Sequence, residues 1–136
     1  MSFPCLRRLA ALLLLSPALA LAAGNPLSVH VLNLQDGLPS PGMTVTLERQ
    51  DQGRWISLSE GVTDSQGRIG GLYPDGQPLR HGVYRVTFKT GAWFAQRRAP
   101  TFFPEVPVIV AVDGSLPHYH VPLLLSPYGY SVYRGN

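Results

Sequence analysis

Cysteine, lysine and long apolar runs are all scarce in this chain of 136 residues. Its single cysteine, Cys5, precedes the first apolar run, and Lys89 is its single lysine. Beyond that start the chain has no thiol for a disulfide framework or for a cysteine nucleophile. No apolar run reaches the roughly 18 residues that a membrane-spanning helix needs. The fold must therefore be stabilised by its own core or by subunit contacts.

The first 23 residues have the pattern of a secretory signal peptide. Arg7 and Arg8 give a basic start without an acidic residue, residues 9–15 are continuously apolar, and small residues follow. This order is typical of a cleaved export signal. We predict cleavage near residues 20–23, a periplasmic destination and no membrane attachment after cleavage. A retained membrane anchor is the alternative.

Removal of the signal leaves one domain, residues 24–136, with almost no net charge. The full chain has 11 Lys+Arg against 8 Asp+Glu, a formal net charge of +3. Arg7 and Arg8 leave with the signal, so nine basic residues remain against eight acidic ones. The basic character is therefore mostly a targeting feature. No run of basic residues interleaved with aromatics remains to indicate nucleic-acid binding.

The rest of the chain shows short strand patterns separated by turns, at the spacing of a β-sandwich or barrel. Strands are predicted at residues 27–34, 43–49, 55–59, 68–69, 83–90, 106–112, 118–125 and 130–134. Residues 35–42, rich in Gly and Pro, predict a loop. Residues 91–98 are expected to form one or two helical turns. We expect one all-β domain, a sandwich of seven or eight strands.

Three of the four histidines fall on strand faces opposite the predicted core. Alternation places His30 outward in its strand, and His118 and His120 outward in theirs. These faces also carry leucines, so they need a covering layer, which in so short a chain we expect to be another subunit. A histidine there can act as acid, base or ligand, or can be a structural interface residue.

Several catalytic motifs are absent from the sequence. It has no G-x-S-x-G nucleophile elbow, no H-E-x-x-H helix and no glycine-rich phosphate loop after a strand. The fourth histidine, His81, precedes Gly82 in a turn and is expected to be solvated. His118 and His120, with His30 nearby, are of the residue type that binds zinc. A zinc site therefore remains an alternative at this point.

Specific strings of the chain match a known family. They are residues 28–33 (SVHVLN), 63–68 (TDSQGR) and 118–126 (HYHVPLLLS), and the ending Tyr133-Arg134-Gly135. Residues 84–86 (YRV) and 102–107 (FFPEVP) match as well. Over residues 27–136 the chain resembles the transthyretin-like 5-hydroxyisourate hydrolases. The Y-R-G ending is typical of these hydrolases and is lacking in the vertebrate transthyretins, which bind thyroid hormones.

The resemblance implies a transthyretin-like (prealbumin-like) two-sheet β-sandwich with one short helix. It implies a homotetramer, a dimer of dimers with active sites in the channel between the dimers. The implied reaction is hydrolysis of 5-hydroxyisourate, a product of urate oxidation in purine degradation, to 2-oxo-4-hydroxy-4-carboxy-5-ureidoimidazoline. Neither a metal nor an organic cofactor is implied. A non-catalytic periplasmic carrier with the same fold, holding an aromatic ligand, is the alternative function.

The family's motif positions fall on His30, Arg68, His120 and the C-terminal residues of this chain. Opening a cyclic amide with water requires a base for the water and a donor for the developing oxyanion. We assign His30 and His120 to orient and deprotonate the water. Arg68 offers a planar fork of donors to the substrate's carbonyl oxygens. Tyr133 and Arg134 are expected to close over the substrate ring.

The last residue departs from the family pattern. The family usually has Ser or Thr after Y-R-G, whereas this chain ends in Asn136. We expect Asn136 to contact the substrate, since its amide both donates and accepts hydrogen bonds. An amide does not shuttle a proton as a hydroxyl does. The sequence therefore predicts retained activity with an altered rate.

Overall fold

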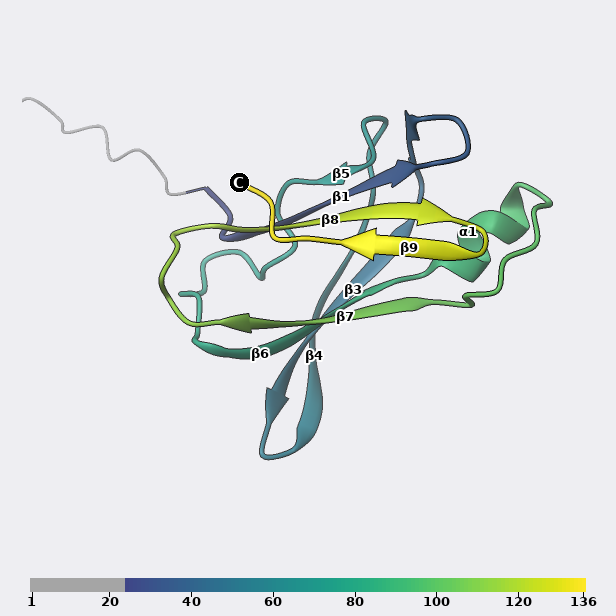
Figure 1. Cartoon of the computed structure of the whole chain (residues 1–136). Coiled ribbons are helices and arrows are strands. Elements are labelled where there is room, and N and C mark those ends of the chain that lie inside the picture. Colours follow the sequence, from purple (N-terminus) through teal and green to yellow (C-terminus); the bar gives the residue numbers. More distant parts are fainter. Residues whose placement is uncertain (1–23) are drawn as a thin grey trace, which may run out of the picture.

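The computed structural model of the chain describes residues 24–136, and the predicted signal peptide lies outside the described residues. Figure 1 shows two β-sheets packed face to face, with one short helix. The elements are β1 Leu27–Asn33, β2 Leu38–Pro39, β3 Thr44–Asp51, β4 Arg54–Val62, β5 Arg68–Ile69, β6 Gly82–Phe88, α1 Thr90–Gln96, β7 Val106–Val112, β8 Tyr119–Ser126 and β9 Gly129–Val132. The predicted two-sheet β-sandwich is confirmed. Within the described residues, no helix is long and apolar enough to cross a membrane.

The first sheet has the strand order β2-β1-β8-β9, and β5 also pairs with β1. The second has the order β4-β3-β6-β7. All pairs are antiparallel except β1 with β8, which run parallel although far apart in the sequence. Because these two strands run parallel and start at the same end of the sheet, Ser28 lies opposite His120 and His30 lies opposite Pro122. This register brings the first and last strand histidines of the chain to one face of one sheet.

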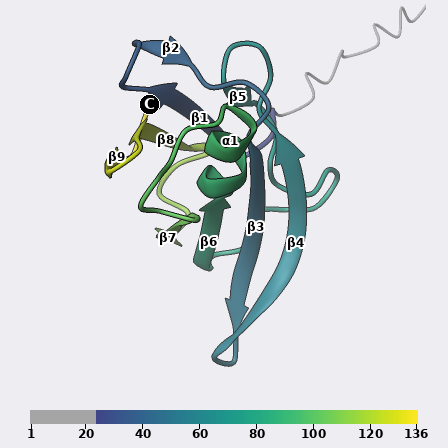
Figure 2. The ribbon, with the colours of Figure 1, turned by 90° about the vertical axis from the view of Figure 1, so that its right-hand side faces the viewer.

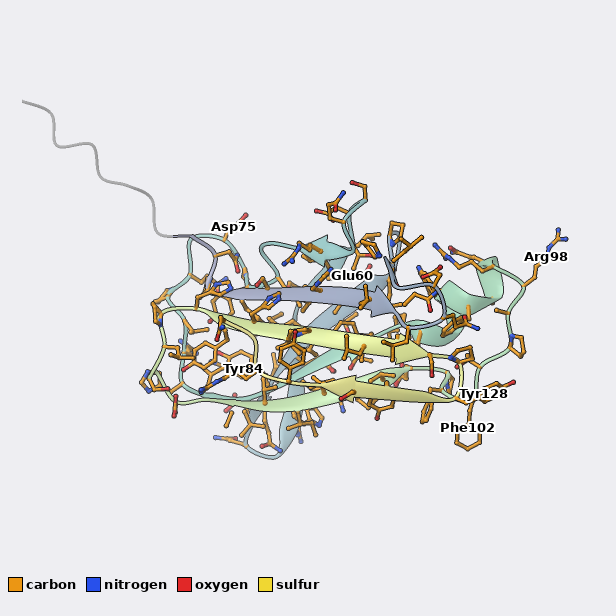
Figure 3. All side chains as sticks on the ribbon, turned by 45° about the horizontal axis from the view of Figure 1, so that its top comes forward. Glu60, Asp75, Tyr84, Arg98, Phe102 and Tyr128 are labelled. Atoms are coloured by element: carbon orange, nitrogen blue, oxygen red, sulfur yellow. The ribbon has the colours of Figure 1, made fainter. Side chains whose placement is uncertain are left out.

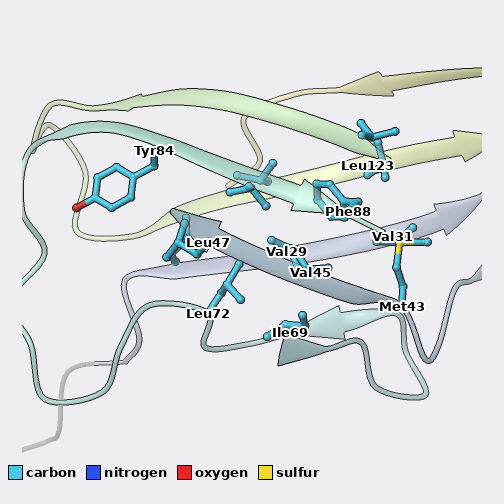
Figure 4. Close-up of a cluster of buried hydrophobic side chains, with 14 of the residues drawn as sticks. Val29, Val31, Met43, Val45, Leu47, Ile69, Leu72, Tyr84, Phe88 and Leu123 are labelled. Atoms are coloured by element: carbon cyan, nitrogen blue, oxygen red, sulfur yellow. The ribbon is translucent and has the colours of Figure 1, made fainter. Parts of the chain in front are cut away.

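The core lies between the sheets and follows the predicted alternation. Val29 and Val31 of β1 face inward with Val45 of β3 and Phe88 of β6, and all four are fully buried. Figure 4 shows these side chains meeting between the sheets. Burying one such side chain contributes about 1.5–3 kcal/mol. A core of this kind stabilises the sandwich without a disulfide, and it leaves the opposite face of β1 for polar residues.

The helix α1 begins one residue before the predicted segment 91–98 and ends two residues before its end. Its Trp93 and Phe94 are buried, and the Trp93 indole N–H donates to the carbonyl oxygen of Pro41 at 2.8 Å. Figure 2 looks onto the end of the sandwich where α1 lies. Since α1 is anchored at this end, it lies away from the start of β1 and β8, where the histidines are.

Three strand predictions require correction. The sandwich has nine strands within residues 24–136 rather than seven or eight, because Leu38–Pro39 inside the predicted loop pairs with the end of β1 as β2. The strand β4 is longer than predicted. Its register with β3 shifts opposite Leu47/Glu48, where one residue of β4 is left unpaired. The strand β9 is shorter and ends at Val132, so Tyr133 and Arg134 lie beyond the strand.

Candidate functional site

The candidate site lies where β5, β1 and β8 run side by side. Arg68 of β5 is the register partner of His30 on β1, and Ser28 of β1 is the partner of His120 on β8. Residues 28 and 30 point to the same face of β1 because side chains alternate along a strand. Strand register therefore brings His30, Arg68 and His120, the three residues assigned from the family resemblance, to one face of the sheet.

Arg68 is positioned by a tight turn that the string TDSQGR encodes. The side-chain Oδ1 of Asp64 accepts the backbone N–H groups of Gln66 at 2.8 Å and of Arg68 at 2.9 Å. These two hydrogen bonds, that from Arg68 first, lower the pKa of the Asp64 carboxyl. Gly67 has φ +70°, and a Cβ on it would come within 2.5 Å of the Val31 carbonyl oxygen. Only glycine fits here, so the turn holds Arg68 against β1.

The C-terminal segment lies directly over His120. The backbone N–H of Gly135 donates to the carbonyl oxygen of His120 at 2.9 Å. A Cβ on Gly135 would come within 2.5 Å of the imidazole Cδ2 of His120. The glycine of the Y-R-G ending thus allows the chain end to pack on the catalytic candidate. In Figure 1 the C-terminus accordingly lies beside the start of β1.

Two adjoining depressions meet at His120. The first is lined by Ser28, Val29, Arg68, Ile69, Gly70, His118, His120 and Asn136. The second, more apolar one is lined by residues 108–111 of β7, by residues 119–121 and by Val132, Tyr133 and Arg134. The structure therefore places Asn136 with Arg68 and His120, and places Tyr133 and Arg134 on the other side of His120.

Burial and a neighbouring cation lower the pKa of both site histidines, which favours their neutral form. Desolvation by burial is the largest cause lowering the pKa of His30 and of His120, and the positive charge of Arg68 is the second cause for both. His118 lowers the pKa of His120 further. At His30, the Gln66 carbonyl and Asp64 oppose the shift in part. A neutral imidazole is the form that accepts a proton from water.

Ser28 connects two histidines at the floor of the first depression. Its Oγ lies 2.8 Å from Nε2 of His118 and 2.7 Å from Nδ1 of His120. The other nitrogen of His118, Nδ1, lies 2.8 Å from the carbonyl oxygen of Asn25. Sequence reasoning missed Ser28 as a site residue and gave His118 a role only in the zinc alternative. The alternation of the strand places Ser28 on the same face as His30, but nothing in the sequence indicates that Ser28 pairs with His120.

The zinc alternative is not supported by this geometry. Within residues 24–136, no group of three or more His, Cys, Asp or Glu side chains is arranged to hold a metal ion. His118 has both ring nitrogens engaged, one with Asn25 and one with Ser28. His30 and His120 alone provide two ligands, fewer than the three protein ligands of a catalytic zinc site or the four of a structural one. The fourth histidine, His81, is exposed, as predicted.

Comparison with known proteins agrees with the fold. A profile of the HIUase/Transthyretin family matches residues 27–135. The 5-hydroxyisourate hydrolase of Salmonella dublin is 51% identical over 125 residues, 91% of each chain. The structure of Klebsiella pneumoniae 5-hydroxyisourate hydrolase is 36% identical, with a TM-score of 0.71 over 81% of this chain and 98% of that one. Sea bream transthyretin in complex with thyroxine is 30% identical, with a TM-score of 0.75 over 81% and 94%. The chain belongs to the HIUase/Transthyretin family.

Proposed function

We propose that this protein is a 5-hydroxyisourate hydrolase. The fold does not decide the matter, because the thyroxine-bound sea bream transthyretin shares it. The observation that carries the proposal is that His120 lies beside the guanidinium of Arg68 in one depression, where burial and the Arg68 charge lower the pKa of the imidazole. A base next to a cationic hydrogen-bond donor suits hydrolysis of a cyclic amide. The relatives that share about half or a third of the sequence bear this activity in their names.

The reaction needs only water and the chain's own side chains. Nε2 of His120 takes a proton from water as the water oxygen bonds to the lactam carbonyl carbon. The Arg68 guanidinium stabilises the oxyanion that forms. The carbon–nitrogen bond then breaks, and the proton on His120 passes to the leaving nitrogen, which leaves a ureido group and a carboxylic acid. The acid releases its proton to solvent and becomes a carboxylate. His30 orients the attacking water, while Tyr133, Arg134 and Asn136 contact the substrate ring.

We further propose that the active protein is a homotetramer, a dimer of dimers. The outer strands β7 and β9 end the two sheets on the same side of the molecule (Figure 2). They expose Ile109 and Tyr130 to 61% and 42%. Phe102 and Tyr128, exposed to 74% and 71%, project together from one end of the sandwich (Figure 3). Exposed apolar side chains along unpaired strand edges favour pairing with another copy.

Export to the periplasm is also part of the proposal. The basic and apolar pattern of residues 1–23 supports it. Amino-terminal sequencing of protein recovered from the periplasmic fraction is expected to begin near residues 21–24. Intact Met1 on membrane-bound protein would instead favour a retained anchor.

The decisive experiment follows the absorbance of freshly generated 5-hydroxyisourate with and without the purified protein. Decay well above the spontaneous rate, proportional to protein concentration, is expected of a hydrolase. A carrier would bind the compound without accelerating its decay, and that outcome would reject the proposal. Light scattering on the same sample measures the mass of the assembly, and a monomer of full activity would reject the tetramer.

A further inference from the structure

A continuous row of hydrogen bonds runs from the backbone at Asn25 to the imidazole of His120. The Asn25 carbonyl oxygen lies 2.8 Å from His118 Nδ1. His118 Nε2 lies 2.8 Å from Ser28 Oγ, which lies 2.7 Å from His120 Nδ1. The Ser28 side chain is buried at 8% exposure, so solvent competes little for its hydroxyl. The row has one end fixed by the backbone and the other at the proposed base.

With His118 in its neutral form, the direction of every hydrogen bond in this row follows from its fixed end. A carbonyl oxygen only accepts, so His118 Nδ1 must carry a proton and donate to Asn25. Nε2 of a neutral His118 then carries no proton, and its lone pair accepts a hydrogen bond from the single hydroxyl proton of Ser28. Since that proton is used, Ser28 Oγ is left to accept from His120, and His120 carries its proton on Nδ1. Nε2 of neutral His120 is consequently the unprotonated nitrogen.

We propose that Ser28 and His118 are positioning residues that hold His120 in the tautomer with Nε2 free to take a proton from water. Ser28 and His118 themselves touch neither the water nor the substrate in this scheme. The kinetic part of the inference rests on the proposed hydrolase function, whereas the tautomer itself is a property of the protein alone.

The role of His118 is to set the direction. If His118 were protonated on both nitrogens, its Nε2–H would donate to Ser28, and the Ser28 hydroxyl would donate to His120 Nδ1. His120 would then carry its proton on Nε2 and could no longer act as the base. Neutral His118, tied to the backbone of Asn25, is therefore the arrangement that keeps the base ready. Removing His118 leaves the Ser28 hydroxyl free to point either way.

The tautomer is tested directly by the imidazole ¹⁵N chemical shifts of His120 in labelled protein, at a pH where the histidines are neutral. Wild-type protein is expected to show a protonated Nδ1 and an unprotonated Nε2. Ser28→Ala and His118→Phe are each expected to give a mixture or the opposite tautomer. A protonated Nε2 in wild-type protein would overturn the inference whether or not the protein hydrolyses 5-hydroxyisourate.

The kinetic test compares Ser28→Ala with Ser28→Thr, which restores a hydroxyl, and with Ser57→Ala, a serine exposed on β4 of the opposite sheet. Ser28→Ala is expected to lower kcat about 10- to 100-fold, by analogy with partners that orient a metal-bound histidine. KM should change little, and Ser28→Thr should recover most of the rate. Equal loss in the Ala and Thr variants, or a Ser28→Ala effect confined to KM, would contradict positioning. If Ser28→Ala fails to fold, the ¹⁵N chemical shifts of His120 in wild-type protein and in His118→Phe still test the proposal.

Discussion

The outer faces of the two sheets use their charged residues in opposite ways. On the second sheet, Arg85 binds Glu48 through two hydrogen bonds of 2.6 and 2.7 Å and lies 4.4 Å over the ring of Trp55. On the first sheet, Arg68 takes part in neither of the two ion pairs found among residues 24–136. It faces two neutral histidines instead, and its charge lowers the pKa of both. One face has its charges neutralised by each other, and the other keeps a cation and two bases available for a ligand.

The difference follows from what lies opposite each arginine. Glu48 is the register partner of Arg85 on the adjacent strand, so the pair forms within the sheet. The register partner of Arg68 is His30, whose neutral ring does not compensate the guanidinium charge. A depression also lies on the second sheet, lined in part by Glu48, Arg85, Lys89 and Glu105. Its four charges are already paired, so it offers no free base or donor of comparable strength.

The largest expected effect comes from removing the proposed base. His120→Ala should lower kcat at least about 100-fold, because general base catalysis contributes roughly 10²–10⁴. His30→Ala should lower it less, since His30 orients the water. The matched control is His81→Ala, an exposed histidine outside the site, which should retain wild-type rate. The measurement is the decay of 5-hydroxyisourate absorbance. Unchanged kcat in His120→Ala would assign the base to another residue.

The next effect comes from lifting the chain end off His120. Gly135→Ala places a Cβ within 2.5 Å of the His120 ring, so the C-terminal segment or the imidazole itself has to shift. We expect kcat to fall about tenfold or more, since a displacement of about 1 Å at a reacting centre can lower the rate roughly 10²-fold. Gly129→Ala is the matched control, because its Cβ would meet only Ser126 Oγ at 3.7 Å. Equal losses in both variants would mean that glycine flexibility, rather than contact with His120, matters.

The pH dependence of activity and of stability tests the two histidines of the first sheet. His120 and His30 have pKa values lowered from 6.5 by burial and by Arg68, so kcat/KM should stay level as pH falls through 6.5 and decline only below it. Stability behaves in the same sense, because the unfolded chain binds more protons between the lowered pKa and 6.5. The free energy of unfolding should therefore decrease as pH falls through that window.

Arg68→Gln tests the cause of this pH dependence. Loss of the guanidinium charge should raise the pKa of both histidines toward 6.5, although burial keeps them below it. Histidine titration followed by NMR measures this without any substrate. Titration of His120 at an unchanged pKa in Arg68→Gln would show that the cation does not act on it.

A smaller effect is expected at the chain end. Asn136 lines the same depression as Arg68 and His120. Asn136→Ser exchanges an amide for a hydroxyl that both donates and transfers a proton, so we expect kcat to rise severalfold, by less than the effects above. Asn136→Ala serves as the control, and it should be slower than either. An inactive wild type that Asn136→Ser restores would mean that the amide does not support the reaction.

The sequence predicts which residues face outward much better than which residues meet. Strict alternation put Val29 inward and His30 outward because the side-chain period of a strand is two. Pairing of Ser28 with His120 depends on a parallel register between strands about 90 residues apart, and no local pattern encodes that. The strand β2 was missed for a related reason, since two residues within a Gly- and Pro-rich loop carry no periodicity. The assignment of Arg68 came from family resemblance, and the turn around Gly67 now explains it physically.

The smallest expected effect lies on the second sheet, where the charges are paired. Glu48→Gln removes the carboxylate whose pKa is lowered chiefly by hydrogen bonds from Arg85. The two side chains are 29% and 22% exposed, so solvent screens the pair, and such pairs contribute about 0–1 kcal/mol. Urea unfolding should therefore show a loss within that range, and 5-hydroxyisourate hydrolysis should proceed at the wild-type rate. Activity that falls with Glu48→Gln while stability holds would place a second functional surface on this sheet. The contrast between a face of paired charges and a face of free ones would then no longer hold.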